Sequence, residues 1–140
     1  DGLRFDLAGI IDTDTTNYLY ASLSNIKKDF MMYGEGWNMG SILFEEKRTS
    51  INNADKVKNF AFFNGEYRDG LKGSVFEKYT KGYLLGNKSY EELIKKGLSG
   101  SLINRKQSIN YVECHDEYTL YDYFKYIIKI ERGIYENSFW

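Results

Sequence analysis

The chain has 140 residues, a formal net charge of −1 and a sequence pI of about 5.9. This length suits one domain, and the charge balance excludes both the basic surface of a nucleic-acid-binding protein and a Lys/Arg cluster typical of membrane-surface binding. No apolar run approaches the roughly 18 residues that a membrane-spanning segment needs, and a single cysteine excludes an internal disulfide framework.

Both ends of the sequence resemble cuts within a longer protein. The first residues, DGLRFD, include no initiator methionine, and the last, YENSFW, contain no signal that ends a helix or a strand. We therefore expect the chain to be part of a longer protein, truncated at both ends. On that expectation, the lack of a signal peptide does not indicate where the protein is found.

Strand and helix patterns alternate along the first half of the chain. Residues 2–6 alternate between apolar and polar side chains, which predicts a strand. Asp12 and Asp14 are typical of a helix start, and the residues behind them place apolar side chains at helical spacing. The apolar runs at 30–33 and 60–63 predict a second and a third strand, with a polar stretch of weak helical character between them.

The second half continues the alternation. Glycines between positions 65 and 73 predict a long loop, and residues 89–92 have the pattern of a capping box that opens a helix. The run SINYVEC (108–114) predicts a fourth strand, and a helix is expected from about 119 with one apolar stripe. Because strands that alternate with helices pair in parallel, we expect an α/β fold.

Acidic side chains stand where the predicted strands end. Asp6 closes the first strand, Glu35 follows the second and Asp116 follows the fourth, whereas the third ends at Asn64. The C-terminal ends of parallel strands share one edge of a sheet, where α/β proteins build their sites. Three carboxylates from three strands at one edge therefore predict a catalytic site.

The spacing of Asp6 and Glu35 allows the geometry of a retaining glycosidase. Neighbouring strands lie about 4.8 Å apart, and retaining glycosidases hold their two carboxyl groups about 5–5.5 Å apart. Arg4 stands two residues before Asp6, on the same side of a strand, so it can keep that carboxylate ionised. The alternative interpretation of Arg4 and Asp6 is an ion pair of purely structural importance.

The stretch Glu113-Cys114-His115-Asp116 contains the only cysteine and the only histidine of the sequence. A metal site here would need ligands from elsewhere, and no second His or Cys exists. A thiol nucleophile with a histidine base is disfavoured because neighbouring strand residues point to opposite faces. We therefore interpret Cys114 as a small buried apolar residue, and His115 with Asp116 as a pair that binds hydroxyl groups of a polar ligand.

Four segments carry a family resemblance: GLRFDLAGIID, YGEGW, AFFNGEYRDGLKGSVF and QSINYVECHD. Together they resemble the pullulanase-type (type I) α-1,6 debranching enzymes of the α-amylase superfamily of glycoside hydrolases. The resemblance implies a partial (β/α)8 TIM barrel that covers roughly the fourth to seventh β/α units. Residues 1–140 would then be part of a single catalytic domain and would lack the remainder of their own barrel.

The resemblance also implies roles for individual residues. Asp6 would be the nucleophile, Glu35 the general acid and base, and Asp116 the group that holds sugar hydroxyls at the cleavage subsite. Further substrate contacts would come from Arg4, Trp37 and His115. The expected partner is an α-glucan substrate (pullulan, amylopectin or glycogen), and this chemistry needs no metal or organic cofactor. Some relatives carry structural calcium, which nothing in this sequence indicates.

One departure from the family pattern follows Asp116. The family usually continues with Asn-His, whereas this chain has Glu117-Tyr118. A catalytically silent α-glucan-binding relative is therefore an alternative, although such relatives usually lose at least one of the three acids. A nucleotide-binding doubly wound domain is a weaker alternative, because residues 6–15 contain one glycine and no G-x-G-x-x-G turn.

We expect the isolated chain to be inactive. A complete barrel of this type takes about 250 residues, and half of one leaves unpaired strand edges.

Overall fold

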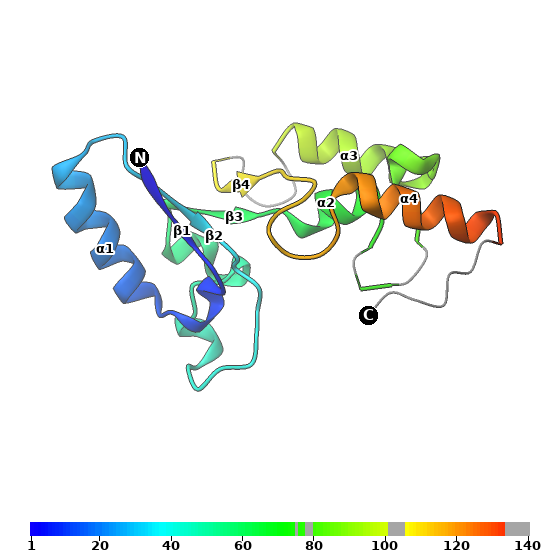
Figure 1. Ribbon diagram of the computed structural model, residues 1–140. Helices are drawn as coiled ribbons and strands as arrows, with labels where there is room; N and C mark the ends of the chain where they lie inside the picture. The colour runs from blue at the N-terminus through cyan, green and yellow to red at the C-terminus, as the bar shows by residue number, and fades with distance from the viewer. Residues whose placement is uncertain (75, 78–79, 101–105, 134–140) are drawn as a thin grey trace. The chain divides into compact units, whose positions relative to one another are not determined.

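The structure is a computed structural model that describes residues 1–74, 76–77, 80–100 and 106–133 (Figure 1). The chain divides into two compact units, which we describe separately: Asp1–Asn64 with Gly100–Ile109, and Gly65–Ser99 with the residues from Asn110 on. Val75 of the RDGLKGSVF segment lies outside the described residues, and so does the whole of the terminal stretch YENSFW, in which the sequence contains no signal that ends a helix or a strand.

The first unit is built on a four-stranded parallel sheet with the strand order β1-β2-β3-β4. Its strands are β1 (Gly2–Phe5), β2 (Met31–Gly34), β3 (Phe60–Phe63) and β4 (Ser108–Ile109). This arrangement confirms the predicted α/β parallel sheet. The first two strands are neighbours, since Phe5 pairs with Gly34.

The fourth strand is much shorter than the predicted run 108–114. β4 ends at Ile109, which pairs with Phe63, the last residue of β3. The helix α2 begins at Gly65, so β3 provides no further backbone groups with which residues beyond Ile109 could pair. The length of β4 is therefore limited by its neighbour and not by its own side-chain pattern.

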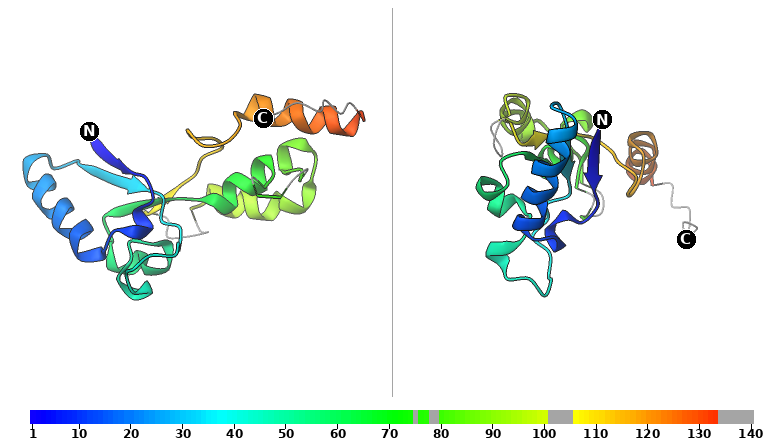
Figure 2. Two further views of the ribbon diagram at one scale, coloured as in Figure 1. Left: turned by 60° about the horizontal axis from the view of Figure 1, so that its bottom comes forward. Right: turned by 90° about the vertical axis from the view of Figure 1, so that its left-hand side faces the viewer.

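Helix α1 (Thr13–Ile26) joins β1 to β2 and runs beside them (Figure 1, Figure 2). The predicted helix start is confirmed: Asp12 is the N-cap residue, and its Oδ1 accepts the backbone N–H of Thr15 at 2.8 Å. The Thr15 hydroxyl donates to Asp12 Oδ2, also at 2.8 Å. These bonds to the ionised form, the backbone bond first, lower the pKa of Asp12 below its usual 3.8.

The cap makes the stability of α1 depend on pH in a predictable direction. Asp12→Ala is expected to cost about 0.5–2 kcal/mol and to speed hydrogen exchange in the first turn of α1 several-fold. Because the folded pKa is lowered, the contribution of the charge is present above about 3.8 and is lost as the pH falls through the folded pKa. Asp12→Asn keeps an acceptor oxygen and is expected to remove this acid-induced loss. An equal loss in Asp12→Asn would contradict the explanation.

The core of the first unit lies between the sheet, α1 and the segment before β3. Its fully buried residues are Ala8, Met32, Val57, Phe60 and Phe62. The Phe60 ring packs against the rings of Phe5 and Phe62, with centroid separations of 5.5 and 5.0 Å. Aromatic contacts between β1 and β3 thus hold these two strands in place on either side of β2. The residues that directly follow the strands are therefore held in place as well.

The second unit is helical. Its helices are α2 (Gly65–Lys72), α3 (Glu91–Leu98) and α4 (Leu120–Glu131), and α2 contacts both others. The predicted long loop between Gly65 and Gly73 is wrong over most of its length, because it forms α2. Gly70 lies against the Leu93 side chain of α3, so a glycine here serves close helix packing. In Figure 2, α2 and α3 lie side by side.

The helix at 91–98 is confirmed, but its predicted capping box does not form. Tyr90 is the N-cap residue and makes no capping bond through its side chain. Ser89 instead belongs to a preceding 3₁₀ turn, where Asn87 Oδ1 accepts both its N–H and its hydroxyl. Because Ser89 is hydrogen-bonded to Asn87, it does not cap the helix, and the side-chain cap forms instead at Asn87, at the start of the preceding turn.

Short 3₁₀ helices complete the described elements. They are η1 (Ala8–Ile10), η2 (Glu45–Lys47), η3 (Ile51–Lys56), η4 (Tyr83–Leu85) and η5 (Lys88–Tyr90). None of the helices within the described ranges is long and apolar enough to cross a membrane.

Candidate active site

Asp6 and Glu35 lie next to each other at the ends of paired strands. Each follows the last residue of its strand, and the paired residues Phe5 and Gly34 come directly before them. The Glu35 N–H donates to the Phe5 carbonyl at 3.1 Å, which continues the ladder by one bond. A carboxylate oxygen of Asp6 lies within 4.8 Å of one from Glu35. The two acids are therefore adjacent, which is the condition that the sequence left open.

Arg4 joins the two carboxylates. Its Nη1 donates to Asp6 Oδ1 at 2.5 Å, as the sequence spacing predicts, and its Nη2 donates to Glu35 Oε1 at 2.8 Å. The second bond was not predicted. The Asp6 side chain is 58% exposed and that of Glu35 only 5% exposed. One guanidinium thus holds an accessible and a buried carboxylate in a fixed relation.

The other oxygen of Glu35 is held by the backbone. Glu35 Oε2 accepts the Leu7 N–H at 3.1 Å. Leu7 has φ 46° and ψ 44°, a left-handed conformation that costs a residue with a side chain about 1–2 kcal/mol. Leucine is not a residue type that indicates a left-handed conformation, so the sequence did not predict the hydrogen bond from the Leu7 N–H to Glu35. The strained turn directs its N–H at the buried carboxylate.

Glycines on both sides of Glu35 allow close backbone packing. A Cβ atom on Gly34 would overlap the Phe5 carbonyl oxygen, and one on Gly36 would overlap the buried ring of Phe62. The sequence indicated these glycines only as the end of a strand. Their role in the structure is to bring Glu35 close to β1 and β3.

Trp37 begins a loop that Arg48 holds together. The Trp37 residue is half-buried, and its carbonyl lies against Gly9 and accepts the Met39 N–H at 2.9 Å. The Arg48 guanidinium donates to the carbonyls of Met39 and Leu43 at 2.7 and 2.8 Å. The loop that carries Trp37 is therefore shaped by backbone hydrogen bonds to a side chain from outside it.

His115 and Asp116 belong to the second unit, whereas Arg4, Asp6, Glu35 and Trp37 belong to the first. His115 Nε2 lies 3.3 Å from Asp116 Oδ1, and both side chains are exposed. The binding of hydroxyl groups by these two residues stays a prediction.

Cys114 is not the small buried apolar residue that the strand pattern predicted, because it is exposed. Its Sγ lies within 4.8 Å of ligand atoms of both His115 and Asp116. The argument that sulfur and imidazole diverge was wrong, since the chain has left the sheet by Ile109 and strand alternation no longer applies.

Polar contacts anchor the segment that leads to His115. The Asn110 side chain donates to the Gly97 carbonyl at 2.9 Å, and Arg68 donates to the Tyr111 hydroxyl at 2.7 Å. Burial, opposed by the charge of Arg68, raises the pKa of Tyr111 to about 12, so its hydroxyl stays neutral. These anchors come from α2 and α3, and no local pattern in 110–116 indicates them.

Glu117 adopts a left-handed backbone conformation with φ 67°. Asn tolerates this region better than Glu, and the related family usually has Asn at this position. We therefore expect Glu117→Asn to relieve strain of about 0.5–1 kcal/mol and to slow hydrogen exchange at the start of α4 by about two- to fivefold.

Glu117→Gln is the matched control for this prediction. Both variants remove the Glu117 charge, which favours the charged form of the buried Lys72, so both lose that contribution equally. Burial, followed by the charge of Arg68, lowers the pKa of Lys72. A difference between the Asn and Gln variants then reports backbone strain alone, and equal exchange rates in the two would contradict the prediction.

Comparison with known proteins gives consistent matches to pullulanases, although no family model matches the chain. The pullulanase of Bacillus subtilis strain 168 is 34% identical over 147 residues, which cover 99% of this chain and 20% of that protein. Pullulanase A of Streptococcus pneumoniae D39 is 27% identical over 98% of this chain and 12% of its own length. This chain thus spans about one fifth or less of these relatives.

Solved structures agree. The pullulanase of Anoxybacillus sp. LM18-11 complexed with maltotetraose matches with a TM-score of 0.84 and 37% identity, over 98% of this chain and 20% of that one. The type I pullulanase of Bacillus subtilis complexed with maltose matches with a TM-score of 0.86 and 34% identity, over 91% and 19%. Over the stretch that it shares with them, the chain is therefore similar to pullulanases, and the matches support a fragment of such a protein.

Proposed function

We propose that the chain is part of the catalytic domain of a retaining hydrolase that cleaves α-1,6-glucosidic branch linkages in pullulan, amylopectin or glycogen. Residues 1–140 would form roughly the fourth to seventh units of a single (β/α)8 barrel. The observation that carries the proposal is the Arg4 bridge, which holds Asp6 and Glu35 within 4.8 Å. This separation favours the retaining mechanism, whose two carboxyl groups stand about 5–5.5 Å apart.

Bond cleavage would use the two carboxyl groups in turn. The accessible Asp6 carboxylate attacks the anomeric carbon while Glu35, in its protonated form, donates its proton to the departing glycosidic oxygen. The bond between that carbon and that oxygen breaks, and a glycosyl ester on Asp6 remains. A water then attacks the same carbon and Glu35 accepts its proton. The ester bond between that carbon and Asp6 breaks, so the sugar leaves and Asp6 becomes a free carboxylate again.

Three further residues would contact the sugar. Asp116 would hold its hydroxyl groups at the cleavage subsite, with His115 as a neighbouring donor. Trp37 would stack on the substrate from its loop. Solved pullulanases complexed with maltotriose and maltotetraose support an α-glucan as the ligand of this site.

The direct test is reducing-sugar release by the complete protein from pullulan, with linear amylose as the control. Release from pullulan but not from amylose is the expected result, because amylose lacks α-1,6 linkages. A well-folded complete protein that binds glucan without releasing sugar would instead be a catalytically silent relative. Glu117-Tyr118 would then be the first residues to replace with the Asn-His pair that is usual in the family.

We also propose that the 140-residue chain is inactive by itself. The four strands among the described residues leave two open sheet edges, and a barrel of this type closes with eight. The purified chain is expected to release no sugar from pullulan under conditions in which the complete protein does. Measurable debranching by the purified chain would contradict this proposal.

A further inference from the structure

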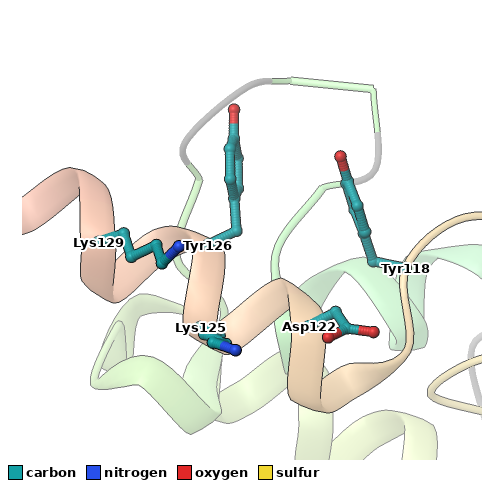
Figure 3. Close-up of a pocket in the computed structure, with 5 residues that line it drawn as sticks. All are labelled: Tyr118, Asp122, Lys125, Tyr126 and Lys129. Carbon is teal, nitrogen blue, oxygen red and sulfur yellow. The ribbon is translucent and has the colours of Figure 1, made fainter. Parts of the chain in front are cut away.

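A pocket of about 310 Å³ lies along one face of α4 (Figure 3). Its lining residues are Tyr118, Asp122, Lys125, Tyr126 and Lys129. This volume is at the small end of the range of about 300–1,000 Å³ that small-molecule sites occupy. The pocket is formed within the second unit alone, and none of its residues has a role in the bond cleavage proposed above.

The helix arranges these side chains on one side. Asp122, Lys125, Tyr126 and Lys129 follow the three- and four-residue spacing of one helical face. Tyr118 comes just before the N-cap residue Thr119. The Asp122 N–H donates to Thr119 Oγ1 at 3.2 Å, and the Thr119 hydroxyl donates to Asp122 Oδ2 at 2.9 Å. The cap therefore fixes the Asp122 carboxylate and the chain direction at Tyr118.

The two tyrosine rings form an aromatic pair. Their centroids are 5.9 Å apart and their planes are inclined by 21°. Figure 3 shows both hydroxyl groups at the end of the rings that points away from the helix. Tyr118 is 46% exposed, so part of this side chain is open to a ligand. A ligand that fits has flat apolar patches and many hydroxyl groups.

We propose that the Tyr118–Tyr126 pocket binds a glucose unit of an α-glucan chain. The C–H faces of a pyranose lie against the tyrosine rings, and its hydroxyl groups donate to Asp122 and accept from Lys129. The mixture of a carboxylate with lysines disfavours a phosphate, which Asp122 repels, and the charged rim disfavours a purely apolar ligand. The choice of glucan as the sugar rests on the proposed function.

The test uses the complete protein and maltotetraose, which contains no α-1,6 linkage. Hydrogen exchange of residues 120–129 is measured with and without the sugar, and the affinity is taken from the titration of that protection. Wild type is expected to show protection. Tyr126→Ala is expected to weaken the affinity about tenfold or more, which corresponds to about 1.4 kcal/mol of lost ring contact.

Two variants serve as controls. Tyr126→Phe keeps the ring and is expected to retain most of the affinity. Tyr18→Ala removes a tyrosine that is 73% exposed on α1 and does not line this pocket, and it is expected to change nothing. Tyr118→Leu, which keeps an apolar side chain without a flat face, replaces Tyr126→Ala if that variant does not fold.

Several results would overturn the proposal. These are the absence of protection in wild type, equal affinities in wild type and in Tyr126→Ala, and protection by inorganic phosphate in place of maltotetraose. The outcome is separable from the proposed function. If the protein binds maltotetraose through Tyr126 but releases no sugar from pullulan, the pocket proposal holds and the proposed hydrolase function is wrong. If it releases sugar from pullulan but does not bind maltotetraose through Tyr126, the hydrolase function holds and the pocket proposal is wrong.

Discussion

In the complete protein, Asp6→Asn and Glu35→Gln are each expected to lower the rate of pullulan hydrolysis by about 10²–10⁴-fold or more. Asp6→Asn removes the nucleophile, and Glu35→Gln removes the proton that the departing sugar oxygen needs. Reducing-sugar release, measured at equal concentrations of folded protein, checks both. Asp14→Asn removes an exposed carboxylate from the first turn of α1 and is expected to leave the rate unchanged.

An activated substrate separates the two roles. Fluoride departs without a proton, so Glu35→Gln is expected to form the glycosyl ester from α-maltotriosyl fluoride at a rate close to that of wild type. Asp6→Asn is expected to lose this step together with the hydrolysis of pullulan. If Glu35→Gln were as slow as Asp6→Asn with the fluoride, or if Asp6→Asn cleaved pullulan normally, the assignment of the two residues would be wrong.

Arg4→Met is expected to produce the second large effect, on stability as well as activity. The buried Glu35 would lose its cation and keep only the Leu7 N–H, and leaving a buried carboxylate unpaired costs about 2–4 kcal/mol. Asp6 would lose its contact with Arg4 in the same variant. We expect faster hydrogen exchange in β1 and β2 and a loss of pullulan hydrolysis of about a hundredfold.

Three variants isolate the reason for this effect. Arg4→Lys keeps the charge but not the fork that reaches both acids, so an intermediate effect is expected. Arg4→Met combined with Glu35→Gln is expected to recover stability, because an amide needs no cation. Lys27→Met breaks the exposed pair with Asp1 at 2.6 Å, a kind of contact that contributes about 0–1 kcal/mol. Equal losses in Lys27→Met and Arg4→Met would contradict the argument.

Strand ends could be predicted where the pattern is local. The alternation over 2–6 and the glycines after 33 depend on residues within one strand, and they placed Asp6 and Glu35 correctly. The contact of Arg4 with Asp6 followed from the same two-residue period. The bond of Arg4 to Glu35 could not be predicted in this way, because it depends on which strand lies next to β1 and on how closely the two strands approach.

Other features could not be predicted because a neighbouring element decides them. The helix α2 was missed because its glycines indicate a loop, whereas Gly70 serves contact with Leu93. Cys114 was placed in a strand that stops at Ile109, where β3 provides no further partner. A side-chain pattern reports preferences, and pairing partners that are distant in sequence decide whether those preferences are met.

By itself, the sequence determined the parallel α/β character of the chain, the positions of Asp6 and Glu35 at two strand ends and the resemblance to the pullulanases. These depend on periodicity and on short motifs, which are properties of neighbouring residues. The tertiary structure alone decided that one guanidinium joins an exposed and a buried carboxylate, that the strained Leu7 N–H completes the shell of Glu35, and that Tyr118 and Tyr126 form a pocket. The physical reason is that these contacts form only after strands and helices have packed.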